Sequence, residues 1–210
     1  MSTAPATVDL DELARRVRER ASDGQRVVVG IAGEPGAGKS TLAAELAAIL
    51  GSESVVLPMD GFHLPQRRLV ELGRRDRMGA PDTFDVAAFV RVLGAIRDDS
   101  DEVAAPSFDR DIEEPVPAAI RITPAHRIVV VEGNYLLHDR DGWEQARALL
   151  DLVAFVRLDP RIRLERLIAR HVAHGKTPDA ARAWATGPDE TNAALIRAGA
   201  DRADLVLAVD

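Results

Sequence analysis

Five short apolar runs recur along the chain, and each is followed by a glycine or an acidic residue. The runs are 26–32, 54–59, 127–131, 152–158 and 203–209. Short continuous apolar runs of this kind are typical of buried strands in a parallel sheet. Between the runs, apolar residues recur at helical spacing, so strands and helices alternate. The pattern predicts an α/β fold, a three-layer sandwich around a five-stranded parallel sheet.

Two further features complete this picture of the fold. Leu10 and Leu13 lie on one face of a first helix, before the first strand. The extended runs 102–108 and 118–122 are separated by polar residues and prolines, so we expect a small inserted hairpin outside the central sheet. Because no internal repeat or low-complexity linker interrupts the chain, residues 1–210 are expected to form a single domain.

The segment GEPGAGKST joins the first predicted strand to a helix. It fits the pattern G-x-x-x-x-G-K-[ST], in which glycines let the backbone N–H groups turn inward, toward phosphate oxygens. A chance glycine turn is the alternative, and the position between strand and helix argues against it. The residues expected to bind the nucleotide are Gly33, Glu34, Pro35, Gly36, Ala37, Gly38, Lys39, Ser40 and Thr41.

Lys39 and Ser40 carry the chemistry of this loop. Lys39 is expected to bridge the β- and γ-phosphates, and the hydroxyl of Ser40 is expected to reach the accompanying Mg²⁺. Of the 27 lysines and arginines, only Lys39 and Lys176 are lysines. A chain so biased toward arginine retains lysine where a slim ammonium group is needed, which supports the role of Lys39.

Two acids stand at the ends of predicted strands, where α/β sheets bind ligands. Asp60 follows the second run and is the candidate general base, which also contacts the metal; the alternative is an Asp-Gly turn. Glu132 follows the central run and is the candidate metal ligand, directly or through water. A surface acid at a strand end is the alternative for Glu132.

Other polar and aromatic residues near these strand ends are candidates for binding the substrate. Each has a structural alternative: Phe62, His63 and Tyr135 could pack, and Asp109 with Arg110 could form an ordinary turn pair. The candidate substrate residues are Phe62, His63, Asp109, Arg110 and Tyr135.

A helix that opens at Pro160 is rich in arginine and begins a helical lid predicted at about 160–187. Arg163, Arg166 and Arg170 have the spacing i, i+3 and i+7, so they share one face. Such a face could close over the nucleotide and stabilise charge on the transferring phosphoryl group. A solvent-exposed face paired with Glu165 is the alternative.

Composition excludes several classes of function. The chain has 46% hydrophobic and 29% charged residues, as ordinary globular proteins do, and a net charge of −7, which argues against a dedicated nucleic-acid binder. Zero cysteines exclude disulfides and cysteine-ligated zinc. The first ten residues lack the apolar core of a signal peptide, and no apolar run could span a bilayer. We therefore expect a cytoplasmic protein without a membrane partner, and the sequence leaves a homodimer open.

Taken together, GEPGAGKST, MDGFHLP, GAPDTFD, VVVEGNYLL and LDPRIRLERLIARHVAHG resemble the P-loop kinases of the uridine kinase, phosphoribulokinase and type I pantothenate kinase group. The resemblance covers most of the chain from about residue 25. It is nearest to bacterial nucleoside/nucleotide kinase-like proteins, also described as fructose-transport-system kinase-like. It implies that Asp60 is the catalytic base, that Glu132 belongs to the metal site and that the basic helix is the lid.

The sequence departs from these kinases at the substrate motifs. Uridine kinases have a tyrosine soon after the catalytic aspartate and a His-Pro-x-Tyr-Asp stretch, whereas this chain has Phe62-His63 and Pro106-Ser107-Phe108-Asp109. Pantothenate kinases also carry a histidine in that second stretch. The resemblance therefore does not assign either uridine or pantothenate as the substrate of this chain.

The sequence predicts a kinase that transfers the γ-phosphoryl group of ATP, with Mg²⁺, to a hydroxyl of a nucleoside, sugar or similar metabolite. The alternative is an NTP-hydrolysing switch or assembly factor. Against the switch, the chain has no Asn-Lys-x-Asp run for guanine and no ABC-type signature.

Overall fold

The computed structural model describes residues 5–22, 24–98 and 101–209. Within these ranges, six strands form one parallel sheet in the order β1-β8-β7-β2-β6-β3. The strands of this sheet are β1 (Ala6–Val8), β2 (Val27–Gly33), β3 (Ser54–Pro58), β6 (Ile128–Gly133), β7 (Leu152–Arg157) and β8 (Leu205–Ala208). The parallel α/β fold expected from the alternating pattern is confirmed.

The strand count predicted from the sequence is wrong by one. The sixth strand, β1, lies at the edge of the sheet and pairs in parallel with β8, where Ala6 is opposite Leu205 and Val8 is opposite Leu207. Three residues are too few to form a recognisable apolar run, so this strand depends on pairing with β8.

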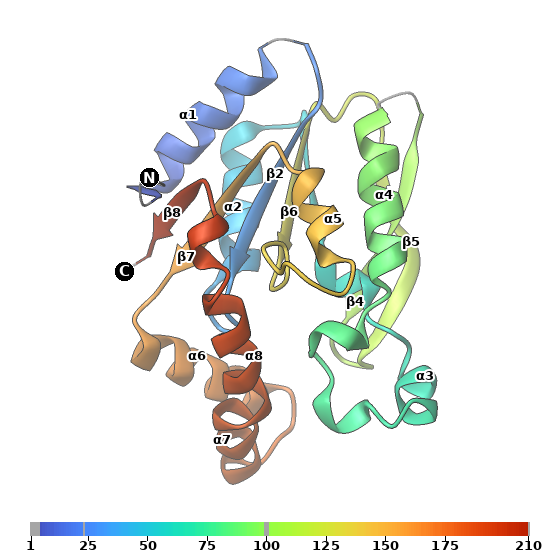
Figure 1. Ribbon diagram of the computed structural model, residues 1–210, viewed down its shortest axis with the longest axis vertical. Helices are drawn as coiled ribbons and strands as arrows, with labels where there is room; N and C mark the ends of the chain where they lie inside the picture. The colour runs from blue at the N-terminus through green and yellow to red at the C-terminus, as the bar shows by residue number, and fades with distance from the viewer. Residues whose placement is uncertain (1–4, 23, 99–100, 210) are drawn as a thin grey trace.

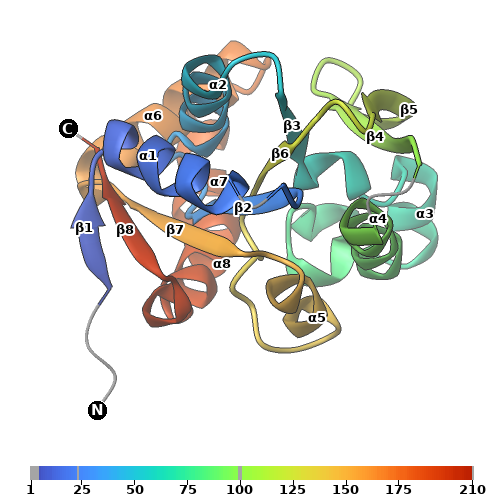
Figure 2. The same ribbon diagram turned by 90° about the horizontal axis from the view of Figure 1, so that it is seen from above.

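Helices cover both faces of the sheet. The helices are α1 (Leu10–Ala21), α2 (Lys39–Leu50), α3 (Gln66–Glu71), α4 (Val86–Asp98), α5 (Trp143–Ala148), α6 (Pro160–Ala173), α7 (Pro178–Thr186) and α8 (Pro188–Arg197). Short 3₁₀ turns lie at η1 (Met59–Phe62), η2 (Arg75–Arg77), η3 (Pro81–Thr83) and η4 (Ala200–Arg202). Figure 2 shows α1 and α2 on one side of the sheet and α4 and α5 on the other.

The core lies in two layers because alternate residues of a strand point to opposite faces. On one side, Val29 and Ile31 of β2 pack with Leu13 of α1 and Leu46 of α2. On the other side, Val28 belongs to a cluster with Phe89 and Leu93 of α4 and Trp143 of α5. Because both faces are covered, the strands are apolar along most of their length, which explains the continuous runs in the sequence.

Two segments extend beyond the carboxyl ends of the strands. The first is the predicted hairpin, formed by β4 (Val103–Asp109) and β5 (Glu114–Ile122), which pair in antiparallel fashion. The second comprises α6, α7 and α8. Figure 1 shows α6–α8 below the sheet on one side and α3 below it on the other. Among the described residues, no helix is long and apolar enough to cross a membrane.

The strand order determines where the candidate site lies. β2, β6 and β3 are neighbours and run in the same direction, so their carboxyl ends meet at one edge. In the register of the sheet, Glu132 of β6 is level with Ile31 of β2 and Pro58 of β3. The loop after β2, the turn after β3 and the end of β6 therefore meet at this edge.

Candidate active site

The loop between β2 and α2 has the backbone conformation of a phosphate-binding loop. Gly36 and Gly38 have φ of 83° and 91°, a region that residues with a side chain rarely adopt. Gly38 is also the residue before α2, and no side chain caps that end of the helix. The first N–H groups of α2 therefore remain available to an anion, and the helix dipole favours negative charge there.

Lys39 is the first residue of α2 and is buried, with 8% of its surface exposed. Its Nζ donates a hydrogen bond to the carbonyl oxygen of Glu34, 3.1 Å away. Burial lowers the pKa of Lys39 to about 8, although the carboxylates of Glu132 and Asp60 oppose that shift. A buried ammonium with a single carbonyl partner lies ready to bind phosphate oxygens.

Ser40, in the first turn of α2, and Glu132, near the end of β6, come together at this edge of the sheet. The Ser40 hydroxyl donates to Oε1 of Glu132 at 3.0 Å. Burial and the negative charge of Asp60 raise the pKa of Glu132. The buried carboxylate of Glu132, the partly buried carboxylate of Asp60 and the Ser40 hydroxyl form an all-oxygen set of donors. Such a set suits Mg²⁺, which proteins hold through one or two carboxylates together with substrate phosphates.

Asp60 lies in η1, directly after β3, and its Oδ2 accepts a hydrogen bond from Arg110 of the hairpin at 2.7 Å. Burial acts to raise the pKa of Asp60, but His63, Arg110 and Lys39 outweigh it, so the pKa is lowered. Asp60 is therefore an ionised carboxylate that can accept a proton or a metal-bound water. The adjacent position 61 requires glycine, because a Cβ there would lie 2.3 Å from the carbonyl oxygen of Pro106.

These groups line a central cavity of about 160 Å³ between the sheet edge, the hairpin and the α6–α8 segment. Its lining comprises Pro35, Lys39, Ser40, Asp60, His63, Arg75, Met78, Gly79, Phe108, Arg110, Glu113, Glu132, Asn134, Arg170, His171, Lys176, Trp184, Asp189 and Asn192. A phosphate groove of about 300 Å³ adjoins it, lined by Gly36, Gly38, Lys39, Ser40, Thr41, Arg110, Arg166 and Arg170. The two share Lys39, Ser40, Arg110 and Arg170, so the groove adjoins the cavity that Asp60 lines.

Arg166 and Arg170 of α6 lie beside the loop between β2 and α2. Both line the phosphate groove from α6. Arg170 is half-buried, and its burial and the nearby charge of Arg110 lower its pKa. Two guanidinium groups on the lid thus face the loop that is expected to hold the phosphates.

The structure contradicts the expectation that Arg163 shares this position. Its side chain is 4% exposed and lines neither the cavity nor the groove. Nε of Arg163 lies 3.0 Å from Oε2 of Glu34, Nη1 donates to the carbonyl oxygen of Pro35 at 3.2 Å, and Nη2 donates to Glu190. Helical spacing correctly places Arg163 on the face of α6 that is directed to the loop. At the level of Arg163, however, this face packs against Glu34 and Pro35. Arg163 holds the loop instead of facing the phosphates.

Three predicted substrate residues also lie outside the cavity. Tyr135 is fully buried and donates its hydroxyl hydrogen to the carbonyl oxygen of Gly79 at 2.6 Å. Phe62 packs edge-on against Phe89 in the core, with ring centres 5.0 Å apart. Asp109 accepts a hydrogen bond from the backbone of Asp111 within the hairpin turn. The structural alternative holds for all three.

His63 and Arg110 do line the cavity. The His63 ring lies between the rings of Phe84 and Phe108, with centres 4.0 and 4.8 Å away. Its Nδ1 lies 2.8 Å from the carbonyl oxygen of Asp60, so His63 also fixes the turn that carries the candidate base. Burial lowers the pKa of His63, which favours the neutral ring.

Sequence reasoning missed most of the cavity lining that comes from α6–α8 and the turns between them. His171 and Asp189 face each other at 2.7 Å, and Lys176 lies over the ring of Trp184, 5.0 Å from its centre. One clue was available, because the scarcity of lysine that singled out Lys39 applies equally to Lys176. The others depend on how three helices fold back over the sheet edge, which local patterns do not reveal.

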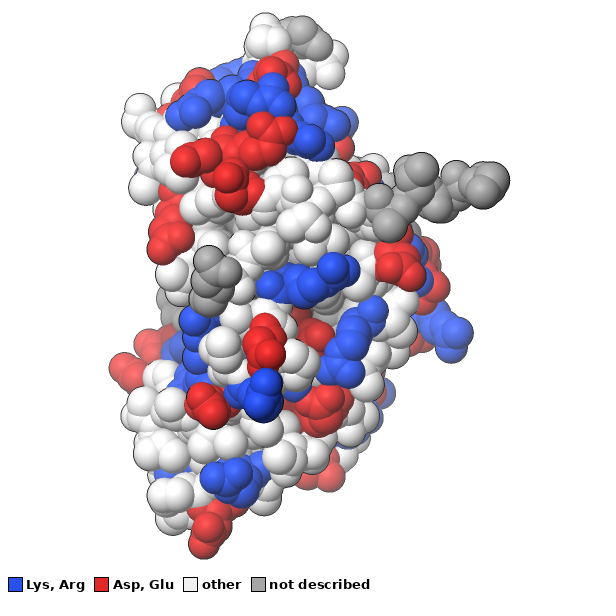
Figure 3. Space-filling model, turned by 90° about the vertical axis from the view of Figure 1, so that its left-hand side faces the viewer, with Lys and Arg blue, Asp and Glu red and all other residues white. Residues whose placement is uncertain are grey.

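Charged residues cluster in the cavity, whereas on the outer surface shown in Figure 3 positive and negative side chains are mixed. Figure 3 shows the left-hand face of the molecule in Figure 1, where the blue and red side chains of the described residues are intermingled. The net charge of −7 is not gathered into one acidic field on this face. Attraction of an anionic ligand is therefore expected to come from the cavity itself.

Comparison with known proteins agrees with this geometry. The sequence model of the Phosphoribulokinase / Uridine kinase family matches residues 28–209. "Putative uridine kinase C227.14" of Schizosaccharomyces pombe is 40% identical over 185 residues, which are 82% of this chain and 77% of that protein. "ATP-dependent kinase-like protein notR'" of Aspergillus versicolor is 41% identical over 133 residues, which are 60% of this chain and 77% of that protein.

A solved structure extends the similarity to almost the whole fold. The crystal structure of a "putative fructose transport system kinase" from Silicibacter sp. TM1040 superposes with a TM-score of 0.87 and 38% identity. The superposition covers 95% of this chain and 98% of that one.

A phosphate-binding loop on a parallel sheet, with acids at the adjoining strand ends and a basic helical lid, defines a P-loop kinase. The match over residues 28–209 is more specific, and the chain belongs to the Phosphoribulokinase / Uridine kinase family. It is therefore an ATP-dependent phosphotransferase that acts on a hydroxyl group of a small molecule.

Proposed function

We propose that the protein transfers the γ-phosphoryl group of ATP, with Mg²⁺, to a hydroxyl of a sugar, nucleoside or similar metabolite. The observation that supports this best is that Asp60, Lys39 and the Ser40–Glu132 pair line one cavity. A kinase needs a carboxylate to receive the proton of the attacking hydroxyl and a cavity that holds the acceptor, whereas a hydrolytic switch needs room only for a water molecule beside the phosphates.

Each group has a defined task in this proposal. Lys39 and the N–H groups of the loop bind the phosphates, and Arg170 balances the charge of the phosphoryl group during transfer. Ser40 and Glu132 would hold Mg²⁺, which supplies charge neutralisation to the phosphates when bound. Asp60 orients the acceptor hydroxyl and takes its proton as the oxygen attacks the γ-phosphorus and ADP leaves.

Arg110 must change partners during this sequence. In the structure it donates to Oδ2 of Asp60, and it also lines the phosphate groove. When an acceptor hydroxyl binds Asp60, the guanidinium of Arg110 can turn to the phosphoryl oxygens without leaving the site. Arg110 then adds a positive charge opposite Arg170.

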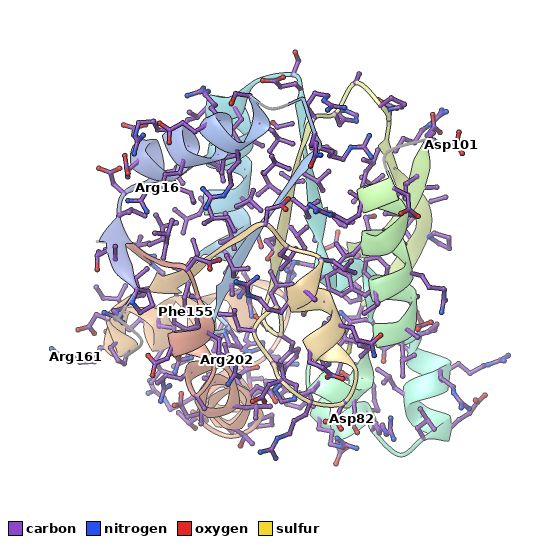
Figure 4. All side chains as sticks on the ribbon, turned by 45° about the horizontal axis from the view of Figure 1, so that its top comes forward. Arg16, Asp82, Asp101, Phe155, Arg161 and Arg202 are labelled. Atoms are coloured by element: carbon purple, nitrogen blue, oxygen red, sulfur yellow. The ribbon has the colours of Figure 1, made fainter. Side chains whose placement is uncertain are left out.

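The experiment measures ADP release with ATP and Mg²⁺, with and without nucleosides, sugars, pantothenate and glycerate. A kinase releases ADP at a rate that depends on the acceptor. Asp60→Asn is expected to lower kcat about 10²- to 10⁴-fold, as loss of a general base does. Asp101→Asn, at an exposed position on the hairpin side of the molecule (Figure 4), is the matched control. Acceptor-independent release that rises only with a protein partner would instead identify a switch.

A further inference from the structure

Lys176 occupies the turn between α6 and α7 and closes one side of the central cavity. Gly175 has φ of 90°, which lets the chain reverse there, and the N–H of Lys176 donates to the carbonyl oxygen of His171 at 3.1 Å. The ammonium lies over the Trp184 ring, 5.0 Å from its centre. The turn and the ring together fix the position of this positive charge.

Most other charges of the cavity already have a partner of opposite sign or a hydrogen bond. Arg110 binds Asp60, Arg75 binds Glu113, and His171 lies 2.7 Å from Asp189. Lys176 forms no ion pair in the part of the chain that the structure describes. Trp184 stabilises the ammonium but does not neutralise it. The cavity therefore contains a partly buried cation that no described carboxylate pairs with and that an anionic ligand could neutralise.

Position distinguishes Lys176 from the cations that serve the phosphates. Lys39 and Arg170 line both the cavity and the phosphate groove, whereas Lys176 lines the cavity alone. The residues that line the cavity with Lys176 but do not line the groove include Asp60, His63 after η1, and Phe108 of β4. Lys176 is thus on the acceptor side of the reacting centre.

We propose that the acceptor carries an anionic group, a carboxylate or a phosphate, which Lys176 binds while the acceptor hydroxyl is held at Asp60. This inference rests on the proposed function and narrows it from any small hydroxyl compound to hydroxy acids and sugar phosphates. Neutral sugars and nucleosides leave Lys176 without a counter-ion and are poor acceptors.

The test compares compounds that differ in their anionic group: D-glycerate with glycerol, pantothenate with panthenol, and ribose 5-phosphate with ribose. Binding to the full-length protein is measured by calorimetry in the presence of Mg²⁺ and a non-hydrolysable ATP analogue, and ADP release is measured with ATP. The variants are Lys176→Gln and Lys176→Arg. Arg161→Gln is the control, because its side chain is 91% exposed and projects outward from the start of α6 (Figure 4).

The expected result is that at least one anionic compound binds more tightly than its neutral counterpart. Lys176→Gln weakens that binding about 10- to 100-fold, as loss of a charged hydrogen bond does, and Lys176→Arg restores part of it. If the anionic compound is also phosphorylated, Lys176→Gln raises the KM for that compound more than the KM for ATP. Whether a carboxylate or a phosphate compound responds identifies the anion.

Three results would overturn the inference. One is that neutral compounds bind as tightly as anionic ones. Another is that no anionic compound shows binding that depends on Lys176. The third is that Lys176→Gln raises the KM for ATP and leaves the acceptor unaffected, which would assign the lysine to the nucleotide. Lys176-dependent binding of an anion without any acceptor-dependent ADP release would instead refute the proposed phosphoryl transfer while upholding the anion site.

Discussion

Replacing Arg163 with alanine tests whether this residue stabilises the phosphate-binding loop or takes part in catalysis. The guanidinium is 4% exposed and contacts Glu34 and Pro35 of the loop and Glu190 of α8. Removing one member of a buried ion pair costs about 3–5 kcal/mol, because the remaining charge stays buried and unpaired. Glu190 is 41% exposed, and Glu34 keeps its pair with Arg197. We therefore expect the lower end of the range, about 3 kcal/mol.

That loss is measurable by thermal unfolding. For a chain of 150–250 residues, each kcal/mol shifts Tm by about 2–4 °C, so Arg163→Ala is expected to lower Tm by about 6–12 °C. Circular dichroism during heating gives Tm, and urea titration gives the free energy of unfolding. The KM for ATP is expected to rise as well, because the loop loses the donor to the carbonyl oxygen of Pro35.

A catalytic arginine would behave differently, and Arg170 supplies the contrast. Arg170→Ala removes a guanidinium from the phosphate groove, so kcat is expected to fall on the order of 10³-fold with little change in Tm. Arg161→Ala, at an exposed position of the same helix, controls for the loss of an α6 arginine. If Arg163→Ala left Tm within one or two degrees of the wild type and kcat fell as in Arg170→Ala, the supporting role would be refuted.

Three further predictions concern the loop, the turn after β3 and the metal site. Because burial lowers the pKa of Lys39 to about 8, part of it is neutral at pH 8.5, and ATP, which favours the ammonium, is expected to bind with proton uptake. Calorimetry at pH 8.5 in buffers of different ionisation enthalpy measures this uptake; an enthalpy independent of the buffer contradicts it. Gly61→Ala is expected to lower Tm, because its Cβ would lie 2.3 Å from the Pro106 oxygen, whereas Gly94→Ala, in open space within α4, is expected to preserve or raise it; equal Tm values would refute the close-contact argument. Glu132→Gln is expected to raise the Mg²⁺ concentration needed for half-maximal ADP release about 10- to 100-fold, and an unchanged requirement would exclude this carboxylate from the metal site.

The sheet and the residues at its edge could be predicted because burial of the strands on both faces determines both the apolar runs and the place where each run ends. A strand covered on both faces is apolar throughout, so the first polar residue after it marks the carboxyl end of the strand. Asp60 and Glu132 were found in this way, and parallel neighbours necessarily bring such residues together. The loop was recognisable because its glycines and Lys39 lie at fixed spacing. Local sequence was sufficient for these features.

Side chains that meet through long-range packing could not be predicted in the same way. The spacing of arginines in α6 shows which of them share a face, but the acids that hold Arg163 come from the loop and from α8. Tyr135 follows Glu132 closely in sequence, yet its hydroxyl reaches Gly79, in a segment without a regular pattern. The lid residues His171 and Trp184 enter the cavity only because α6–α8 fold back over the sheet edge.

The arrangement of α6 has a consequence for how variants of this protein should be interpreted. Arg170 lies seven positions after Arg163 in α6, about 10 Å along the helix axis. One rigid helix therefore contacts the back of the loop through Arg163 and lines the phosphate groove through Arg170. Any change that loosens Arg163 also displaces Arg170, and it can therefore lower kcat without touching the reacting atoms. A loss of activity identifies a catalytic arginine in this lid only where the free energy of unfolding, measured on the same variant, is unchanged. By that criterion Arg163 and Arg170 are distinguishable, although their spacing in the sequence places both on one face of the helix.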